Sequence, residues 1–286
     1  MGERAGAAFH ARGTIIGGSK VKISALYIYP VKSLGPIAMS SVAVEQRGLK
    51  GDRRWLIVDD ANRFVTRREI PALAAVRMHH EGEGGYRLTG AAGTALLESE
   101  MASDAVAPVQ IWRDIVDAVI AENEASRLLS DIAGRTLRLA YMPDDTRRRV
   151  DPDFAQPQDI VSFADGYPIL VTSEASLAAL NAVLENPVEM MRFRPNIVLA
   201  GDMDAWSEND WPLVRAGDVR LRLVKPCSRC IVITQQPETG ASEEGNAVPM
   251  ALRKLGKFNK EGALFGMNAI AQDSVRIAVG DMVAVM

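Results

Sequence analysis

The residues best suited to chemistry are the only two cysteines of the chain, Cys227 and Cys230. Lys225 and Arg229 stand beside them in a segment that reads Lys-Pro-Cys-Ser-Arg-Cys. Nearby positive charge favours the thiolate, which is the form of cysteine that acts as a nucleophile or binds a metal ion. This segment is therefore the first candidate for a functional site.

The segments on either side predict how the cysteines are held. Residues 218–224 alternate between aliphatic and polar side chains, which is typical of a half-buried strand. Residues 231–234 are mostly apolar and β-branched, so they predict a second strand. Pro226 lacks a backbone donor and should end the first strand. The cysteines are therefore expected in a tight turn between two strands.

Four interpretations of this turn stay open from the residues alone. A thioredoxin-like redox pair would open a helix, whereas a strand is expected to follow here. A closed zinc site needs four ligands, and beyond the two thiols the chain has only His10, His79 and His80. One thiolate can instead hold a soft transition metal whose other ligands come from a cofactor. The simplest alternative is two small, inert residues in a buried turn.

Six ordered sequence blocks resemble the motifs of the MOSC-domain family, which includes the C-terminal domain of molybdenum cofactor sulfurase, the mitochondrial amidoxime-reducing component and bacterial YcbX. A lone Cys-x-x-Cys pair would be weak evidence, but six blocks in family order across about residues 22–286 are specific. The blocks are Tyr29–Ser33, Gly51–Trp55, Phe163–Pro168, Arg192–Asn196, Pro226–Gly240 and Leu264–Asn268.

The resemblance implies a molybdopterin-type molybdenum cofactor, a pterin with an enedithiolate and a phosphate tail. The phosphate needs cations and fixed N–H donors, and the planar guanidinium of arginine matches it with two parallel hydrogen bonds. The family is also associated in general with pyridoxal phosphate. The residues that the resemblance places at the cofactor are Lys32, Ser33, Arg53, Gly166, Tyr167, Arg194, Asn196, Ser228 and Arg229.

The resemblance also makes Cys230 the protein ligand of the molybdenum and leaves Cys227 as a structural neighbour. Soft sulfur donors suit such a metal. Asp165 is the only carboxylate of the turn 163–168; it either orients a metal-bound water and relays a proton or caps its own turn. Three further arginines beside these blocks are expected to be ordinary surface charges: Arg54, Arg67 and Arg68.

The elements that must position these residues predict an α+β chain that is mainly β. Short β-rich runs between turns, residues 72–78 among them, suggest an antiparallel barrel or sandwich. Helices are expected at about 122–132, 174–184 and 249–258, the second with Ser173 as its N-cap. The resemblance implies an antiparallel, barrel-like MOSC N-terminal domain followed by a MOSC β-barrel domain with peripheral helices.

The expected division of the chain is a flexible leader at 1–21, a MOSC N-terminal β-rich domain at 22–142, a linker at 143–160 and a MOSC domain at 161–286. The linker is rich in proline and charge and contains three consecutive arginines, Arg147–Arg149. Such a composition favours a solvated linker, with a lid over an anionic ligand as the alternative.

Composition narrows the class of protein. With 48% hydrophobic and 24% charged residues, the chain resembles an ordinary globular protein with a substantial core. Its net charge of −3 argues against nucleic-acid binding through bulk charge. No apolar run approaches the ~20 residues of a membrane span, so no membrane partner is expected. Two cysteines without a disulfide framework fit a reducing cytoplasm.

The resemblance implies an oxidoreductase that reduces N-hydroxylated compounds, such as hydroxylaminopurines, hydroxylamines and amidoximes, and so detoxifies N-hydroxylated bases. The chain offers no cysteines for the ferredoxin-like domain of YcbX, so a separate ferredoxin- or flavoprotein-type electron donor is expected. The alternative is a carrier of the molybdenum cofactor, or of sulfur as a persulfide on Cys230, without its own turnover. A hydrolase has little support because the chain has no Gly-x-Ser-x-Gly motif.

Overall fold

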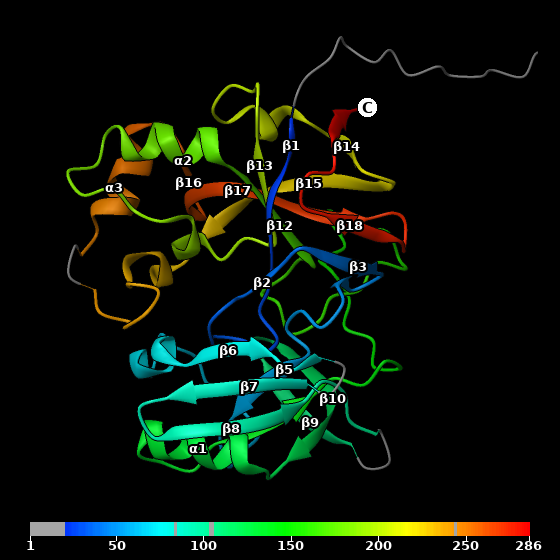
Figure 1. The fold of residues 1–286 in the computed structure, drawn as a ribbon, viewed down its shortest axis with the longest axis vertical. Helices are drawn as coiled ribbons and strands as arrows, with labels where there is room; N and C mark the ends of the chain where they lie inside the picture. Colours follow the sequence, from blue (N-terminus) through cyan, green and yellow to red (C-terminus); the bar gives the residue numbers. More distant parts are fainter. Residues whose placement is uncertain (1–20, 83–84, 103–105, 243–244) are drawn as a thin grey trace, which may run out of the picture.

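The structure, a computed structural model, describes residues 21–82, 85–102, 106–242 and 245–286. The predicted leader therefore lies almost wholly outside the described residues. The described part is mainly β with three α-helices, as the sequence predicts. Figure 1 shows a larger body built on a nine-stranded sheet and, below it in this view, a smaller body that carries α1.

The larger body is organised by a sheet in the order β19-β14-β15-β17-β12-β13-β1-β2, with β16 paired to β17. Its pairs are antiparallel except that β12 and β13 run parallel. Its strands are β1 (Lys22–Ile28), β2 (Ile37–Met39), β12 (Ile169–Ser173), β13 (Ile197–Ala200), β14 (Leu213–Ala216), β15 (Val219–Arg229), β16 (Phe258–Asn259), β17 (Gly262–Ala271) and β19 (Val283–Val285).

Three smaller sheets complete the fold, in the orders β5-β11-β10-β9, β6-β7-β8 and β18-β3-β4. A two-residue turn at Trp112 and Arg113 joins β9 to β10. The strands are β3 (Ser41–Glu45), β4 (Gly48–Leu49), β5 (Trp55–Val58), β6 (Arg77–His80), β7 (Gly85–Gly90), β8 (Gly93–Glu98), β9 (Ala107–Ile111), β10 (Asp114–Ala121), β11 (Arg138–Tyr141) and β18 (Arg276–Ala278).

The three predicted helices are present within a few residues of their expected limits: α1 (Glu124–Ala133), α2 (Glu174–Asn181) and α3 (Ala247–Lys254). The predicted cap of α2 is confirmed, because the Ser173 side chain accepts a hydrogen bond from the backbone N–H of Ser176. α1 ends at Gly134, whose left-handed backbone favours glycine. Short 3-10 helices lie at Pro71–Ala75, Met190–Phe193, Ser207–Asp210 and Ile231–Thr234.

Two of these 3-10 helices replace predicted strands. Residues 231–234 form η5 rather than a strand after the cysteines, and η1 at Pro71–Ala75 takes most of the strand predicted at 72–78. The pairing of β15 with β17 ends at Arg229, so the following β-branched run has no partner strand. Its backbone folds back on itself instead, with the N–H of Ile233 donating to the carbonyl of Cys230 at 3.2 Å. Strand propensity depends on such a partner.

The predicted stop at Pro226 is also wrong, because β15 continues through it to Arg229. The register between β15 and β17 shifts between Leu223 and Lys225, and again between Pro226 and Ser228. Bulges of this kind accommodate a residue without an N–H donor. The cysteines therefore lie at the irregular end of a strand and not in a turn between two strands.

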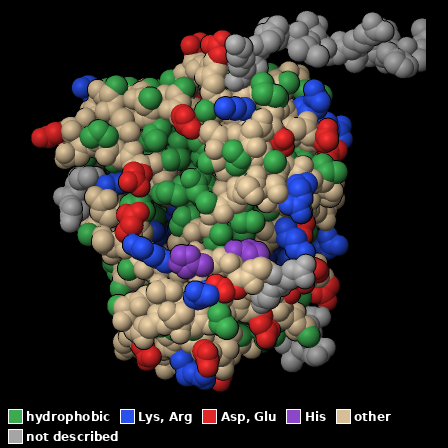
Figure 2. Space-filling model, viewed as in Figure 1, with side chains coloured by type: hydrophobic (Ala, Val, Ile, Leu, Met, Phe, Trp, Pro, Cys, Tyr) green, Lys and Arg blue, Asp and Glu red, His purple; other side chains and the backbone are tan. Residues whose placement is uncertain are grey.

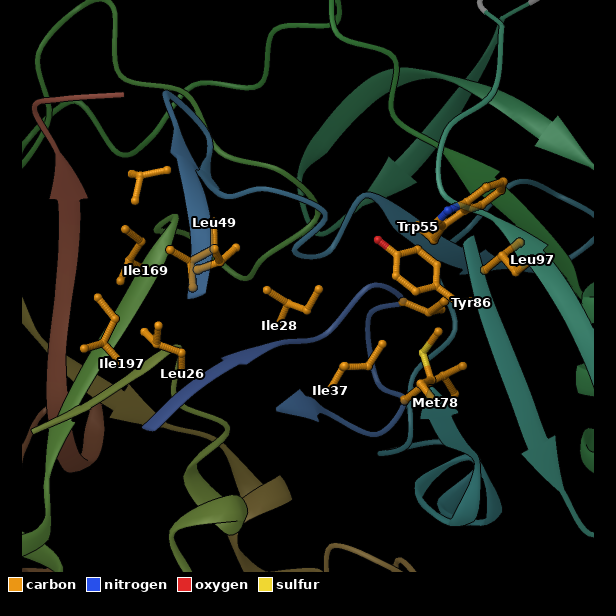
Figure 3. Packing of buried hydrophobic residues seen from close by; sticks show 14 of the residues in the cluster. Leu26, Ile28, Ile37, Leu49, Trp55, Met78, Tyr86, Leu97, Ile169 and Ile197 are labelled. Atoms are coloured by element: carbon orange, nitrogen blue, oxygen red, sulfur yellow. The ribbon is translucent and has the colours of Figure 1, made fainter. Parts of the chain in front are cut away.

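The largest hydrophobic core runs through both bodies. Leu26 and Ile197 of the nine-stranded sheet belong to the same buried cluster as Trp55 and Leu97 of the smaller body (Figure 3). β1 also pairs with β13, which lies far later in the chain, and β2 pairs with β1 at the edge of the large sheet. One close-packed core thus fixes the two bodies against each other, while the domain limits at 22–142, 143–160 and 161–286 stay a prediction.

Candidate functional site

A narrow cleft of about 110 Å³ lies where loops of the two bodies meet, and a hollow of about 220 Å³ adjoins it. Ligand sites are common at such junctions. Ser228 lines the hollow, together with both cysteines. The other ten sequence-predicted residues line the cleft itself: Lys32, Ser33, Arg53, Asp165, Gly166, Tyr167, Arg194, Asn196, Arg229 and Cys230.

One side of the cleft, which we call the basic wall, consists of Lys32, Arg53, Arg67 and Arg194. Its centre is Tyr29, which is fully buried. The guanidinium carbons of Arg53 and Arg194 lie 4.4 and 4.2 Å from the centroid of the Tyr29 ring. Cation–π contact of this kind stabilises a guanidinium away from water, so the ring holds two positive charges side by side at the cleft.

Hydrogen bonds fix Arg53 further. Its Nη1 donates to Asp52 Oδ2 at 2.7 Å and to Asn196 Oδ1 at 3.0 Å. Asp52 is 1% exposed and also accepts from the backbone N–H of Tyr29. Burial opposes the charge on Arg53, but the Asp52 carboxylate outweighs it and raises the pKa of Arg53. Asn196 donates in turn to the carbonyl of Tyr27, so its amide positions Arg53 within the fold.

Backbone strain is concentrated at the same wall. In the described part of the chain six non-glycine residues have positive φ, and three of them line the cleft: Ser33 at 79°, Arg53 at 48° and Arg194 at 52°. Such conformations cost on the order of 1–3 kcal/mol each and persist where the surroundings impose them. The hydrogen bonds of Arg53 and Arg194 are part of what imposes them here.

Lys32 of the basic wall forms an ion pair with Asp165, which also lines the cleft. Lys32 Nζ donates to Asp165 Oδ1 at 2.5 Å and to the carbonyl of Phe163 at 2.9 Å. Burial lowers the pKa of Lys32 to about 8, against the attraction of Asp165. For Asp165, burial opposes the charge, but the Lys32 ammonium outweighs it and holds the pKa of that carboxyl well below its usual range. Asp165 is therefore an ionised partner of Lys32.

Arg148 shapes the loop that carries Asp165. Its Nη1 donates to the carbonyls of Ser162 and Ala164 at 2.9 and 2.5 Å, and its Nε donates to Asp114 at 2.7 Å. Arg148 is 6% exposed, so the expectation of a solvated segment is wrong at this residue. A buried guanidinium that donates to two loop carbonyls is a feature that charge patterning alone does not reveal.

The opposite side, which we call the thiol wall, is the segment Cys227–Cys230. Cys230 is exposed and Cys227 is half-buried, and both are free thiols. Arg229 Nη1 donates to Cys227 Sγ at 2.9 Å, and Arg68 Nη2 donates to Cys230 Sγ at 3.3 Å. Both sulfurs therefore accept a hydrogen bond from a guanidinium group. The expectation of two residues in a buried turn is therefore wrong, because one cysteine is half-buried and the other is exposed.

The expectation that Arg54, Arg67 and Arg68 are surface charges is wrong. Arg67 is buried and donates to Gln235 Oε1 at 2.8 Å. Arg68 stacks over Trp112, 4.6 Å from its ring centroid. Arg54 is also buried and donates to the carbonyl of Met142. For Arg67 the sequence contains one indication of its role. Its partner Gln235 belongs to the block 226–240, and a buried amide needs a hydrogen-bond partner.

The cleft has a strong excess of positive charge. Among the described residues that line it, six are cationic and Asp165 is the one carboxylate. Burial lowers the pKa of Arg67 to about 10 and that of Arg194 to about 9. Such guanidiniums lack sufficient negative charge nearby, and an anion bound between them would supply it. The charge of the cleft is therefore suited to an anionic ligand.

The residues present fit a phosphorylated, sulfur-ligated cofactor. Basic side chains on one wall suit its phosphate, and the exposed Cys230 thiol on the other suits a soft metal. The buried Nε atoms of Arg68 and Arg229 have no hydrogen-bond partner among the described residues, so they are available to a ligand. Within the described ranges no three His, Cys, Asp or Glu side chains gather as a metal site of their own, and the histidines of β6 lie at the waist of the molecule (Figure 2).

Fold and cleft together define a mainly β protein in two parts, with a basic cleft beside a free, exposed cysteine. Residues 20–136 match the MOSC N-terminal beta barrel domain, and residues 158–284 match the MOSC domain. The chain therefore belongs to the MOSC family, in the branch that joins these two domains.

The curated relatives point the same way. The mitochondrial amidoxime-reducing component 1 of Mus musculus is 32% identical over 77% of this chain and 67% of its own length. The proteins of the same name from Danio rerio and Homo sapiens are 31% and 29% identical, over 76% and 91% of this chain and 70% and 82% of their own lengths. In the ranges that the structure describes, no helix combines the length and the apolar character of a membrane span.

Proposed function

We propose that this protein is a molybdenum-cofactor-dependent reductase of N-hydroxylated compounds that takes its electrons from a separate donor protein. The observation that carries the proposal is the exposed Cys230 thiol, which faces a cleft with six cationic side chains. The relatives named as amidoxime-reducing components support the reductase. The substrates would be hydroxylaminopurines, hydroxylamines or amidoximes.

The two walls would hold different ends of the cofactor. Arg53, Arg67 and Arg194 would bind the phosphate as the arginines of the basic wall. Arg53 is already held by Asp52, whereas burial lowers the pKa of Arg67 and Arg194, which a bound anion would counteract. Gly166 and Tyr167 would border the pterin, and Cys230 would bind the molybdenum. When bound, the cofactor supplies two-electron redox chemistry that no amino-acid side chain provides. Pyridoxal phosphate would use the same phosphate site but gives the cysteine no role, so we favour the pterin.

Reduction of an N-hydroxyl group consumes two electrons and two protons and yields an amine and water. A proton must therefore reach the leaving oxygen. Lys32 is better suited to give it than Asp165, because the pKa of Lys32 lies at about 8 whereas Asp165 stays ionised. Asp165 would orient the Lys32 ammonium through their 2.5 Å contact. We thus assign proton delivery to Lys32 and positioning to Asp165.

The test is a Cys230→Ala variant of protein produced with ample molybdate. Molybdenum content, and reduction of 6-hydroxylaminopurine with dithionite as reductant, are measured for both proteins. Loss of at least about a thousandfold in turnover, with unchanged thermal stability because Cys230 is exposed, is the expected result. Tight cofactor binding without turnover in the wild type would instead support a carrier. A fully active Cys230→Ala variant would refute the proposal. Free thiols at the site also lead us to expect a reducing compartment such as the cytoplasm.

A further inference from the structure

We propose that the electron donor docks on the surface formed by the end of α3 and strand β16, and that this donor is a small acidic protein that carries one electron. That the protein needs an electron donor rests on the proposed function, whereas the surface itself is described from the fold. We call it the docking face and define it by Met250, Arg253, Lys254, Lys257, Phe258 and Lys260.

The docking face is strongly basic in an acidic chain. Residues 253–260 contain four cations and no acidic residue, although the chain as a whole carries −3. Arg253, Lys254 and Lys260 are exposed. Lys257 is half-buried, with its ammonium 4.9 Å from the ring centroid of Trp206. A local field of this sign steers an acidic protein toward this face and repels a basic one.

The same face carries apolar anchors. Phe258 is 38% exposed and Met250 is 68% exposed. The guanidinium of Arg253 lies 4.6 Å from the ring centroid of Phe258, so the two side chains already form one platform. Aromatic, methionine and arginine side chains are enriched where proteins bind proteins. Ile231, which is 63% exposed, extends this apolar area on η5, next to α3.

The strand register brings the docking face to the thiol wall. Phe258 pairs with Ala263, and Ala263 pairs on its other side with Arg229. Paired strands lie about 4.8 Å apart, so Phe258 is about two strand spacings from Arg229, the residue before Cys230. Beyond Phe258, the turn residue Glu261 lines the same hollow as Cys230 (α3, β16 and β17 lie together in Figure 1). A protein docked here would reach the site over a short distance.

The chemistry favours a weak and rapidly exchanging contact. Each turnover takes up two electrons and two protons, and a one-electron carrier must therefore dock, deliver its electron and leave twice. Small, mainly electrostatic interfaces suit such exchange. A few exposed cations around a small apolar centre provide this kind of interface, and the required partner is a protein with an acidic rim around its redox centre.

The test uses the full chain and, as probe, a plant-type [2Fe–2S] ferredoxin. Calorimetric titration at low salt is expected to show binding that weakens as salt is added. A Lys254→Glu/Lys260→Glu variant should bind at least about fivefold more weakly, since both residues are exposed cations. The control, Arg77→Glu/Arg127→Glu, makes the same charge change at exposed residues of β6 and α1 and should bind like the wild type.

Turnover separates this proposal from the proposed function. With ferredoxin as reductant the docking variant should show a KM for ferredoxin raised at least about fivefold, and with dithionite it should match the wild type. Absence of turnover with every reductant would refute the proposed reductase function. The calorimetric titration would then test the docking face by itself. Unchanged ferredoxin binding in the variant, or no binding by the wild type, overturns the docking face. The docking face is also overturned if the variant loses binding to vesicles of phosphatidylserine and phosphatidylcholine but keeps its binding to ferredoxin. The surface would then be a membrane contact.

Discussion

The two walls of the cleft differ in how firmly their functional groups are held. On the basic wall, Tyr29 and Asp52 are buried and Arg53 is fixed by a carboxylate, an amide and an aromatic ring. On the thiol wall, Cys230 is exposed at the irregular end of a strand, with a 3.3 Å contact from Arg68. One wall is rigid before any ligand arrives, whereas the other is open.

This difference corresponds to two tasks. A phosphate anchor works best when its cations are already in place, because ordering them on binding would cost affinity. A reactive sulfur must instead be reached by a cofactor, a substrate and an electron donor, so exposure serves it. The stability of the cleft should therefore reside in the basic wall, and its reactivity in the thiol wall.

The largest effect on stability is expected from Asp52→Ala. The change leaves the Arg53 guanidinium and the backbone N–H of Tyr29 buried without their acceptor, which costs about 3–5 kcal/mol. Urea unfolding measures this loss, and binding of inorganic phosphate should weaken with it.

Two variants sharpen that experiment. Asp52→Asn keeps an acceptor for the Tyr29 N–H without the charge, so its loss should be intermediate. Asp273→Ala breaks an ion pair with Arg220 that is far more exposed, and such pairs contribute little. Equal losses for Asp52→Ala and Asp273→Ala would show that the buried pair of Asp52 and Arg53 does not stabilise the basic wall.

A smaller effect is expected from the titration of Lys32. Its pKa is about 8 in the folded protein, against an ordinary value of 10.5. Between these pH values the unfolded chain binds more protons, so this group makes stability rise with pH, by up to about 3 kcal/mol across the window. Phosphate affinity should fall over the same window, because the cleft loses a cation.

The Lys32→Met variant isolates this contribution, since other groups titrate in the same range. Unfolding free energies at several pH values are compared for the wild type, Lys32→Met and Lys50→Met, an exposed lysine. The rise should shrink in Lys32→Met alone. Equal slopes in all three proteins would show that Lys32 is not held in a desolvated environment.

Much of the fold could be predicted from the sequence because local patterns carry it. The Ser173 cap, the Gly134 stop and the alternating strands are all local signals. The wrong predictions concern segments whose structure depends on a neighbouring strand. Residues 231–234 have the composition of a strand but no strand to pair with, and Pro226 is tolerated because bulges in β15 surround it.

The site could be predicted only where the family motifs cover it. The blocks located Arg53, Arg194 and Cys230, which the fold brings to one cleft. Arg67, Arg68 and Arg148 were missed because an arginine on a surface and an arginine in a cleft look alike in a sequence. Their roles depend on carbonyls, a ring and a thiol supplied from far along the chain.

The smallest effect is expected from Cys227→Ser, which tests whether openness alone makes a cysteine reactive. Cys227 is half-buried and accepts from Arg229 at 2.9 Å, whereas Cys230 is exposed beside Arg68. A serine hydroxyl can accept the same Arg229 hydrogen bond, so stability should change by less than about 1 kcal/mol and dithionite-driven turnover by no more than a few fold. The measurement is turnover and molybdenum content beside the Cys230→Ala variant. If Cys227→Ser were as inactive as Cys230→Ala, both sulfurs would take part in the reaction, and the thiol wall would be a cysteine pair with shared chemistry instead of one ligand and its neighbour.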